Sequence, residues 1–275
     1  MVSLTEGSIA PGIFRYTLPL IGASLIHHYL LLFCLSGILD DCGSYACGIV
    51  NYEGEEMEKR FSCIDCGAMS CDKCNHAHPS FCVSKGLDQE IIDESLKEYK
   101  KKKNQKVMQA SAETEFEYYC QATRVEETML WAKKLGAKKI GIASCVGLLK
   151  ESRTLAAILR KNGFEVYGIG CKAGEVPKTT VGIDEKCNAI GVNMCNPILQ
   201  AKVLNREKTD INIVMGLCVG HDSLFYKYSK ALTTTLVTKD RVLGHNPVAA
   251  LNCAHSYYMD KLENCISRYA QDKQA

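Results

Sequence analysis

Short apolar runs alternate with amphipathic segments in the second half of the chain. Four runs have the length of strands: 138–144, 164–170, 211–217 and 232–238. Between the first two, apolar residues recur at helical spacing and stop at Asn162–Gly163. Asn–Pro pairs at 196–197 and 246–247 each have the order of an N-cap residue followed by a first helical residue. The pair at 246–247 predicts a last helix that runs to about Tyr269. The alternation predicts an α/β fold over 136–269, with a Rossmann-like, mainly parallel sheet and flanking helices.

Residues 88–135 predict a helical connector in front of this α/β part. Apolar residues at helical spacing, beginning at Ile91 and including Tyr99, indicate a first helix. The charged run KKKNQK at 101–106 is expected to interrupt it. A second helix is expected to run through Leu135 and to stop at Gly136.

An N-terminal extension, residues 1–60, precedes everything else. Its segment 17–39 holds no Asp, Glu, Lys or Arg and is long enough to cross a bilayer. Pro19, the adjacent His27 and His28, and a preceding segment whose basic residue is Arg15 argue against a membrane anchor, since they give neither a signal-peptide n-region nor a clear charge bias. A membrane anchor, a buried helix and a wrongly chosen start codon remain as alternatives. The acidic stretch 53–60 separates the extension from the rest, which we expect on the cytosolic side, with the segment as an optional membrane tether.

Composition excludes several classes of protein. The chain has 275 residues, 47% of them hydrophobic and 23% charged, with 6 prolines, so it can bury a core and is not a disordered or collagen-like chain. Lys and Arg number 33 against 31 Asp and Glu, a net charge of +2 that does not predict a nucleic-acid surface. A small molecule or a metal is the expected partner, and the oligomeric state is left open.

Cysteine is the outlier, with 16 residues in a chain too long to need disulfides for stability. Five of them lie in a Cys-rich knuckle over 61–87, namely Cys63, Cys66, Cys71, Cys74 and Cys82. Two C-x2-C pairs direct four soft ligands at zinc or at iron, so the spacing predicts a metal site. Such a site can serve only to keep the segment folded. Disulfides are the remaining alternative.

Three predicted strands end in the same residue type, because Cys145, Cys171 and Cys218 each follow a strand and are closely followed by glycine. The carboxyl ends of parallel strands line one crevice, so these thiols should converge. Cys195, just before the helix start at 196–197, can join them. A lone strand-end cysteine is usually a small buried hydrophobe. Together the four predict a metal centre, iron–sulfur (4Fe-4S) in preference to zinc, and three ligands would leave one iron open.

Polar residues are expected at the same edge of the sheet. His221 and His245 can donate or accept protons near neutral pH, while Lys239 and Arg241 can hold an anionic group. Asp222 and the Asn of the 246–247 pair also have the chemistry of helix N-caps.

Several motifs resemble a known prokaryotic family, the "predicted metal-binding protein" family or domain of unknown function 1847. The similar segments are CIDCGAMSC, GIASCVGL, CKAG, MCNPILQAKVLN, GLCVGHDSLF and TLVTKDRVLGHNPVAAL, within about 61–262. The resemblance implies Cys63, Cys66, Cys71 and Cys82 as the N-terminal ligand set and leaves Cys74 over. It brings no established reaction. At the level of fold alone, strand-end cysteines also resemble those of iron–sulfur desulfidases that act on thiouracil.

Two functions follow as hypotheses. The first is an iron–sulfur protein, desulfidase-like or redox-active, in which a cluster at the strand ends acts in sulfur or redox chemistry on a small molecule. The alternative is a zinc-binding structural, sensor or carrier module without catalysis.

Overall fold

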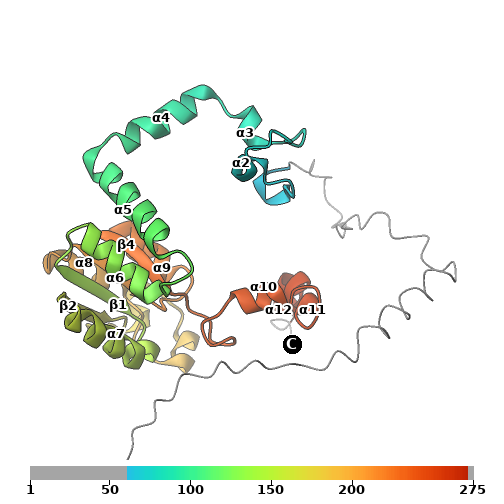
Figure 1. Ribbon diagram of the computed structural model, residues 1–275. Helices are drawn as coiled ribbons and strands as arrows, with labels where there is room; N and C mark the ends of the chain where they lie inside the picture. Colours follow the sequence, from blue (N-terminus) through green and yellow to red (C-terminus); the bar gives the residue numbers. More distant parts are fainter. Residues whose placement is uncertain (1–60, 272–275) are drawn as a thin grey trace, which may run out of the picture. The chain divides into compact units, whose positions relative to one another are not determined.

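The computed structural model describes residues 61–271 and divides into two compact units (Figure 1). Of the described residues, the first unit contains 61–69 and 79–81, and the second contains 70–78 and the chain from Cys82 onward. The N-terminal extension with its apolar segment 17–39 lies outside the described residues. Within 61–271, none of the helices is long and apolar enough to cross a membrane.

A four-stranded parallel sheet forms the centre of the second unit and confirms the predicted α/β class. Its strands are β1 (Lys139–Ser144), β2 (Glu165–Gly170), β3 (Ile211–Met215) and β4 (Leu232–Val237). Their spatial order is β2-β1-β3-β4, so β1 and β3 are the inner strands. All three pairings are parallel, which places the carboxyl ends of the strands at one edge.

Helices cover both faces of this sheet, as expected for a Rossmann-like fold. On one face, α6 (Arg124–Lys134) and α7 (Leu149–Lys161) pack with Ile140 and Ile213 in one buried cluster. On the other, α8 (Pro197–Arg206) and α9 (His221–Tyr228) contribute Leu204 and Phe225 to a second cluster with Val214. The second cluster also contains the cysteines of the candidate site.

The remaining elements are short or lie outside these two layers. The elements that precede α6 along the chain are a 3-10 helix (Cys63–Asp65) and the helices α2 (Ser70–Lys73), α3 (Val83–Gly86), α4 (Gln89–Tyr99) and α5 (Lys102–Tyr118). Between strands lie the 3-10 turns Val146–Leu148, Lys178–Val181 and Glu185–Ile190. The described chain ends in α10 (Val248–Asn252), α11 (Met259–Glu263) and α12 (Cys265–Gln271).

The connector is helical, and its first helix ends at the predicted run: α4 stops at Tyr99 and α5 begins at Lys102. The rest of the charged run lies inside α5, because exposed lysines are good helix formers. The prediction of one second helix up to Leu135 is wrong, because the chain is interrupted before α6, where Cys120 has a φ of 55°. Thr123 then caps α6: its Oγ1 accepts the Glu126 N–H, and Glu126 Oε2 accepts the Thr123 N–H at 2.8 Å.

Two predicted helix starts are also wrong. Helix α9 begins at His221 after Gly220, whose φ of 80° turns the chain there, so Asp222 lies inside the helix and is not its N-cap. The single last helix to Tyr269 is replaced by α10, α11 and α12, and α10 is preceded by Pro247 without a side-chain cap. No residue of α10 or α11 is buried, so no packed face supports one long helix.

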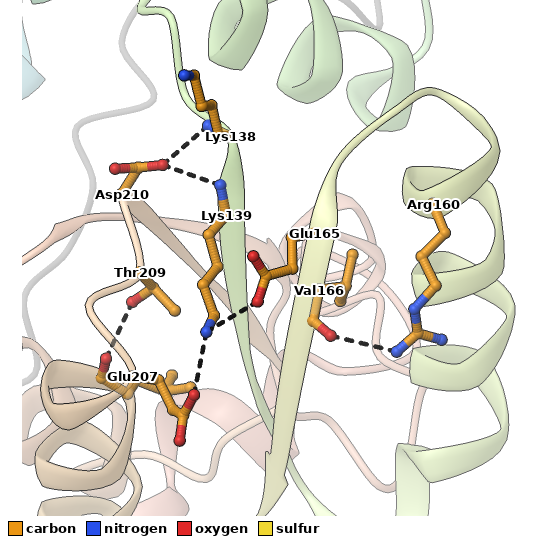
Figure 2. Close-up of polar contacts among 9 residues, drawn as sticks. Lys138, Lys139, Arg160, Glu165, Val166, Glu207, Thr209 and Asp210 are labelled. Carbon is orange, nitrogen blue, oxygen red and sulfur yellow. Dashed lines mark hydrogen bonds and ion pairs between the residues drawn. The ribbon is translucent and has the colours of Figure 1, made fainter.

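A polar network fastens the amino edge of the sheet (Figure 2). Asp210 Oδ2 accepts the backbone N–H groups of Lys138 and Lys139, both at 2.8 Å. Lys139 Nζ lies 2.9 Å from Glu165 Oε1 and 3.0 Å from Glu207 Oε2, and hydrogen bonds to these two carboxylates raise the pKa of Lys139. The network ties together the starts of β1 and β2 and the turn before β3. The opposite, carboxyl edge carries the cysteines.

Replacing Gly141 with alanine should destabilise the sheet. A Cβ at Gly141 would lie 2.1 Å from Oδ1 of Asn212, a fully buried side chain hydrogen-bonded to Thr209. Relieving this overlap should lower the free energy of unfolding by about 1–3 kcal/mol, measured by urea denaturation. Gly86→Ala is the control, since a Cβ there meets no described atom within 4 Å. Equal midpoints for the two variants would contradict this packing.

Candidate functional site

Two site cysteines are held by the hydrogen-bond ladder of the sheet itself. The Cys145 N–H donates to Met215 O at 3.0 Å, and the Cys171 N–H donates to Ser144 O at 2.8 Å. Each bond continues the parallel ladder by one residue past a strand. The backbones of Cys145 and Cys171 are therefore placed as firmly as the strands.

The third cysteine comes from the start of α8. The Asn196 N–H donates to Cys171 O at 2.7 Å, which brings the preceding residue, Cys195, to the same edge. Asn196 also caps α8, because its Oδ1 accepts the Leu199 N–H at 2.9 Å, and Pro197 is the first helical residue. The Asn–Pro signal at 196–197 is thus confirmed.

These three thiols are in contact, with Cys171 in the middle. The Cys171 side chain is hydrogen-bonded to those of both Cys145 and Cys195. Cys145 is 7% exposed and Cys171 3%, while Cys195 is half-buried beside them. We call these three residues the thiol chain. The predicted convergence of strand-end thiols therefore holds for Cys145 and Cys171, and Cys195 joins them.

The three members of the thiol chain differ in the direction of their pKa shifts. The hydrogen bond from Cys171, the Gly147 N–H and Lys239 lower the pKa of Cys145 to about 5, against the effect of burial. The hydrogen bond from Cys171, aided by the charges of Lys172 and His221, lowers the pKa of Cys195 to about 6. Its two thiol neighbours and its burial raise the pKa of Cys171. The two outer sulfurs therefore carry negative charge while the central thiol keeps its proton.

Cys218 follows β3 but is bound differently. Its Sγ accepts a hydrogen bond from Arg241 Nη2 at 2.9 Å, and this contact raises the pKa of the guanidinium. The turn that delivers it depends on Gly216, which has a φ of 66° and whose Cβ would lie 2.0 Å from Leu148 Cδ1. Cys218 is half-buried, so its sulfur is more open than those of Cys145 and Cys171.

The loop after β4 supplies both cations that face the sulfurs. Lys239 interacts with Cys145, and Arg241 with Cys218. Asp240 between them fixes the loop, since its Oδ1 accepts the N–H groups of Val242 at 2.9 Å and Leu243 at 2.8 Å. The loop thus presents one cation to each of two sulfurs.

The two histidines predicted at this edge have different surroundings. His245 Nδ1 accepts the Asp240 N–H at 3.2 Å, so this nitrogen is used to shape the loop. His221 opens α9, and its charge acts on Cys195. His221 is therefore the histidine that the structure brings to the thiol chain.

Gln200 joins the segments that carry the thiol chain. It is completely buried in α8, and its Nε2 donates to Ser144 O at 3.1 Å and to Ile169 O at 2.8 Å. One side chain of α8 thereby links the end of β1 to the end of β2. The two carbonyls fix the orientation of the amide, and its Oε1 is buried without a hydrogen-bond partner among the described residues.

The arrangement does not form a ready single-ion site. Within residues 61–271, no group of three or more His, Cys, Asp or Glu side chains is placed to hold one metal ion. Cys145 and Cys195 each contact Cys171, whereas they influence each other only through their charges. Cys171 is therefore the thiol that contacts both of the others.

The N-terminal cysteines fall into both compact units. Cys63 and Cys66 belong to the first, and Cys71, Cys74 and Cys82 to the second. Within the second, Cys82 Sγ lies 3.5 Å from His78 Nδ1. All cysteines of the described residues are free thiols. The predicted metal knuckle stays a prediction.

Sequence reasoning missed two contributors to the site. Gln200 could have been noticed as one amide on the otherwise apolar face of α8, a common mark of a buried hydrogen-bonding side chain. Lys172, directly after Cys171, carries a charge into the site. The Gly147 N–H bonds to the Cys145 sulfur, as expected from a glycine that follows a strand-end cysteine closely and lets the backbone approach its sulfur.

Comparison with known proteins agrees with the resemblance seen in the sequence. The family model described as "Protein of unknown function (DUF1847)" matches residues 82–236. An uncharacterised protein of Methanocaldococcus jannaschii is 44% identical over 195 residues, which covers 70% of this chain and 98% of that protein. Cys145, Cys171, Cys195 and Cys218 all lie inside the matched family region.

Mild oxidation should trap the thiol chain. In metal-free protein treated with diamide, Cys171 should form a disulfide with Cys145 or with Cys195, because its sulfur contacts both. Peptide mapping under non-reducing conditions identifies the pairs. Cys171→Ser should abolish both disulfides, and Cys120→Ser, at an exposed cysteine, should leave them unchanged. Oxidation spread evenly over the exposed cysteines would contradict the arrangement.

Gln200→Met should loosen this pairing. The variant keeps the volume but loses both hydrogen bonds to the strand ends, so the yield of the Cys145–Cys171 disulfide should fall severalfold. The free energy of unfolding should fall by about 1–3 kcal/mol. Asn212→Leu is the matched control, because Asn212 is an equally buried amide that bonds Thr209 and Ser229 instead. If both variants lost the disulfide equally, Gln200 would contribute only to the general stability of the fold and not to the positions of the two thiols.

Proposed function

The chain belongs to the DUF1847 family of proteins of unknown function, and on that premise we propose that its strand-end thiols hold an iron–sulfur cluster that serves sulfur or redox chemistry on a small molecule. One observation carries the proposal. Three cysteines from three separate segments meet in the thiol chain, and the pKa values of its outer members fall to about 5 and about 6. Thiolates are the ligands that such clusters require, so Cys171 would give up its proton when iron binds.

The origin of the thiols in three separate segments favours a cluster over a single zinc ion. A structural zinc ion needs four donors around one point, and the described residues do not converge in that way. In a cluster each thiolate binds a different iron, so cysteines from three separate segments can each supply one ligand. The apolar side chains of Val214, Leu217 and Phe225 surround the thiol chain and would limit access of water.

The cations at the edge suit an anionic cluster. Lys239 acts on Cys145, while Lys172 and His221 act on Cys195. These charges would offset the negative charge of the thiolates and of inorganic sulfide. Gly147 donates its N–H to the Cys145 sulfur, a contact of the kind that tunes cluster potential.

Three protein ligands would leave one iron free of protein donors. When bound, such a cluster would supply either electron transfer or a Lewis-acidic iron. His221, beside Cys195, would move a proton to or from the bound small molecule. The protein would act as an enzyme in this reading, and His245 would support the loop that carries Lys239 and Arg241.

A zinc-binding module without catalysis is the second candidate, and the N-terminal segment favours it. Cys82 Sγ lies 3.5 Å from His78 Nδ1, and thiolate with imidazole is a common donor pair for zinc. In this version the metal would stabilise the segment, and the strand-end cysteines would only pack.

Metal analysis of protein purified without oxygen tests the proposal. We expect iron and acid-labile sulfide in near-stoichiometric amounts, with a broad visible absorption band. Cys171→Ser should remove most of the iron, and Cys120→Ser should retain it. Stoichiometric zinc without iron, unchanged by Cys171→Ser, would overturn the proposal in favour of the second candidate.

A further inference from the structure

We propose that Cys218 is the reacting thiolate of this edge, which accepts a sulfur atom from a small anionic donor of sulfane sulfur and carries it as a persulfide. The four cysteines of this edge, Cys145, Cys171, Cys195 and Cys218, thus divide into three that hold the centre and one that reacts. This inference rests on the proposed function, because the sulfur atom is taken to pass to the cluster held by the thiol chain. The reaction at Cys218 itself needs no iron.

The first support is the different partner of Cys218. The members of the thiol chain are bonded to one another, whereas Cys218 Sγ is bonded to Arg241 Nη2 at 2.9 Å. A guanidinium at this distance stabilises a thiolate, which is the nucleophilic form of cysteine. A reactive cysteine needs such a partner.

Access to the sulfur is the second support. Cys218 is half-buried in the turn between β3 and α9, and the neighbouring Val219 is 95% exposed. Gly216 and Gly220 have φ values of 66° and 80°, so the turn is tight and holds its cysteine at the surface of the sheet edge. A small donor can therefore reach Cys218 without displacing the packed core.

Charge is the third support, and it indicates the class of donor. Arg241 donates to Cys218, Lys239 interacts with Cys145, and Lys172 and His221 act on Cys195. Several positive groups around one partly open edge attract small anions. Thiosulfate and low-molecular-weight persulfides are anions that contain sulfane sulfur.

The chemical step balances without an oxidant or a reductant. The Cys218 thiolate attacks the outer sulfur of the donor, a new S–S bond forms, and the donor's own S–S bond breaks. Its electron pair leaves with sulfite when the donor is thiosulfate, or with a thiolate when it is a persulfide. The outer sulfur of the new persulfide carries the negative charge, so the total charge is unchanged and Arg241 remains its counter-ion.

The position of Arg241 connects this step to the thiol chain. Besides its bond to Cys218, the guanidinium interacts electrostatically with Cys145 and Cys195. A sulfur atom added to Cys218 would therefore lie in the field of the same cation that acts on the outer sulfurs of the thiol chain. The carboxyl edge of the sheet can then receive a sulfur atom at Cys218 and use it in the reaction at the centre held by the thiol chain.

The experiment uses the full chain in two forms, metal-free and iron-loaded, with thiosulfate as the probe. Both forms should gain one sulfur atom on the peptide that contains Cys218, seen by mass spectrometry, and cyanide should release it as thiocyanate. Cys218→Ala should abolish this while retaining the iron content of the loaded form. Arg241→Gln should slow sulfur uptake about tenfold or more, as loss of a charge-assisted hydrogen bond predicts, and Arg241→Lys should restore part of the rate.

Arg160→Gln is the matched control, because the Arg160 side chain donates to Val166 O at 3.2 Å, near the start of β2 and away from the sulfurs (Figure 2). Its rate should equal that of the unchanged protein. Equal labelling of the exposed Cys120 would overturn the assignment, and so would loss of iron together with Cys218. Absence of sulfur on Cys218 in protein that still binds iron would overturn this inference alone. Labelling of Cys218 in protein that never binds iron would overturn the cluster alone.

Discussion

The hydrogen bonds that extend the parallel sheet past its strands determine the rest of this structure. The Cys145 N–H reaches Met215 O, the Cys171 N–H reaches Ser144 O, and the Gly216 N–H reaches Val237 O at 2.7 Å. A slip of one residue in any pairing would turn a cysteine to the opposite face of the sheet. The fastened amino edge, with Asp210 bonded to the start of β1, and the tight contact at Gly141 both oppose such a slip. The site therefore depends on sheet register before it depends on any side chain.

Burying sulfur among apolar side chains opposes ionisation, and the structure offsets this with three kinds of group. Burial raises the pKa of each member of the thiol chain. Neighbouring thiols, the N–H of Gly147 and the cations of three different segments act in the other direction on the outer members. The cations Lys239 and Arg241 come from a loop beyond an edge strand, which Asp240 and His245 hold together. The ionised sulfurs are thus a property of the assembled fold and not of any one motif.

The sequence predicted those parts of the molecule that follow from burial and topology. Runs such as 138–144 are apolar because the inner strands are covered on both faces, and strand-end cysteines meet because parallel strands end at one edge. The errors arose where local signals compete. The cap chemistry of Asp222 says little about a helix boundary that tertiary contacts decide, and the spacing of apolar residues did not mark the interruption between α5 and α6. Pairing of Cys218 with Arg241 joins two loops, so no periodicity could have predicted it.

Gln200 shows that the thiol chain and Cys218 are supported in different ways. A buried amide with an unpartnered Oε1 is unfavourable by about 1–3 kcal/mol. An apolar residue would avoid this, but it could not bond the carbonyls that end β1 and β2. The thiol chain thus has a rigid support on the side of α8, while Cys218 sits in a glycine-bounded turn with a single side-chain partner. Rigid support suits ligands whose spacing must not change, and a more open turn suits a sulfur that must meet a substrate. This contrast in support, more than the identity of the residues, separates the holding cysteines from the reacting one.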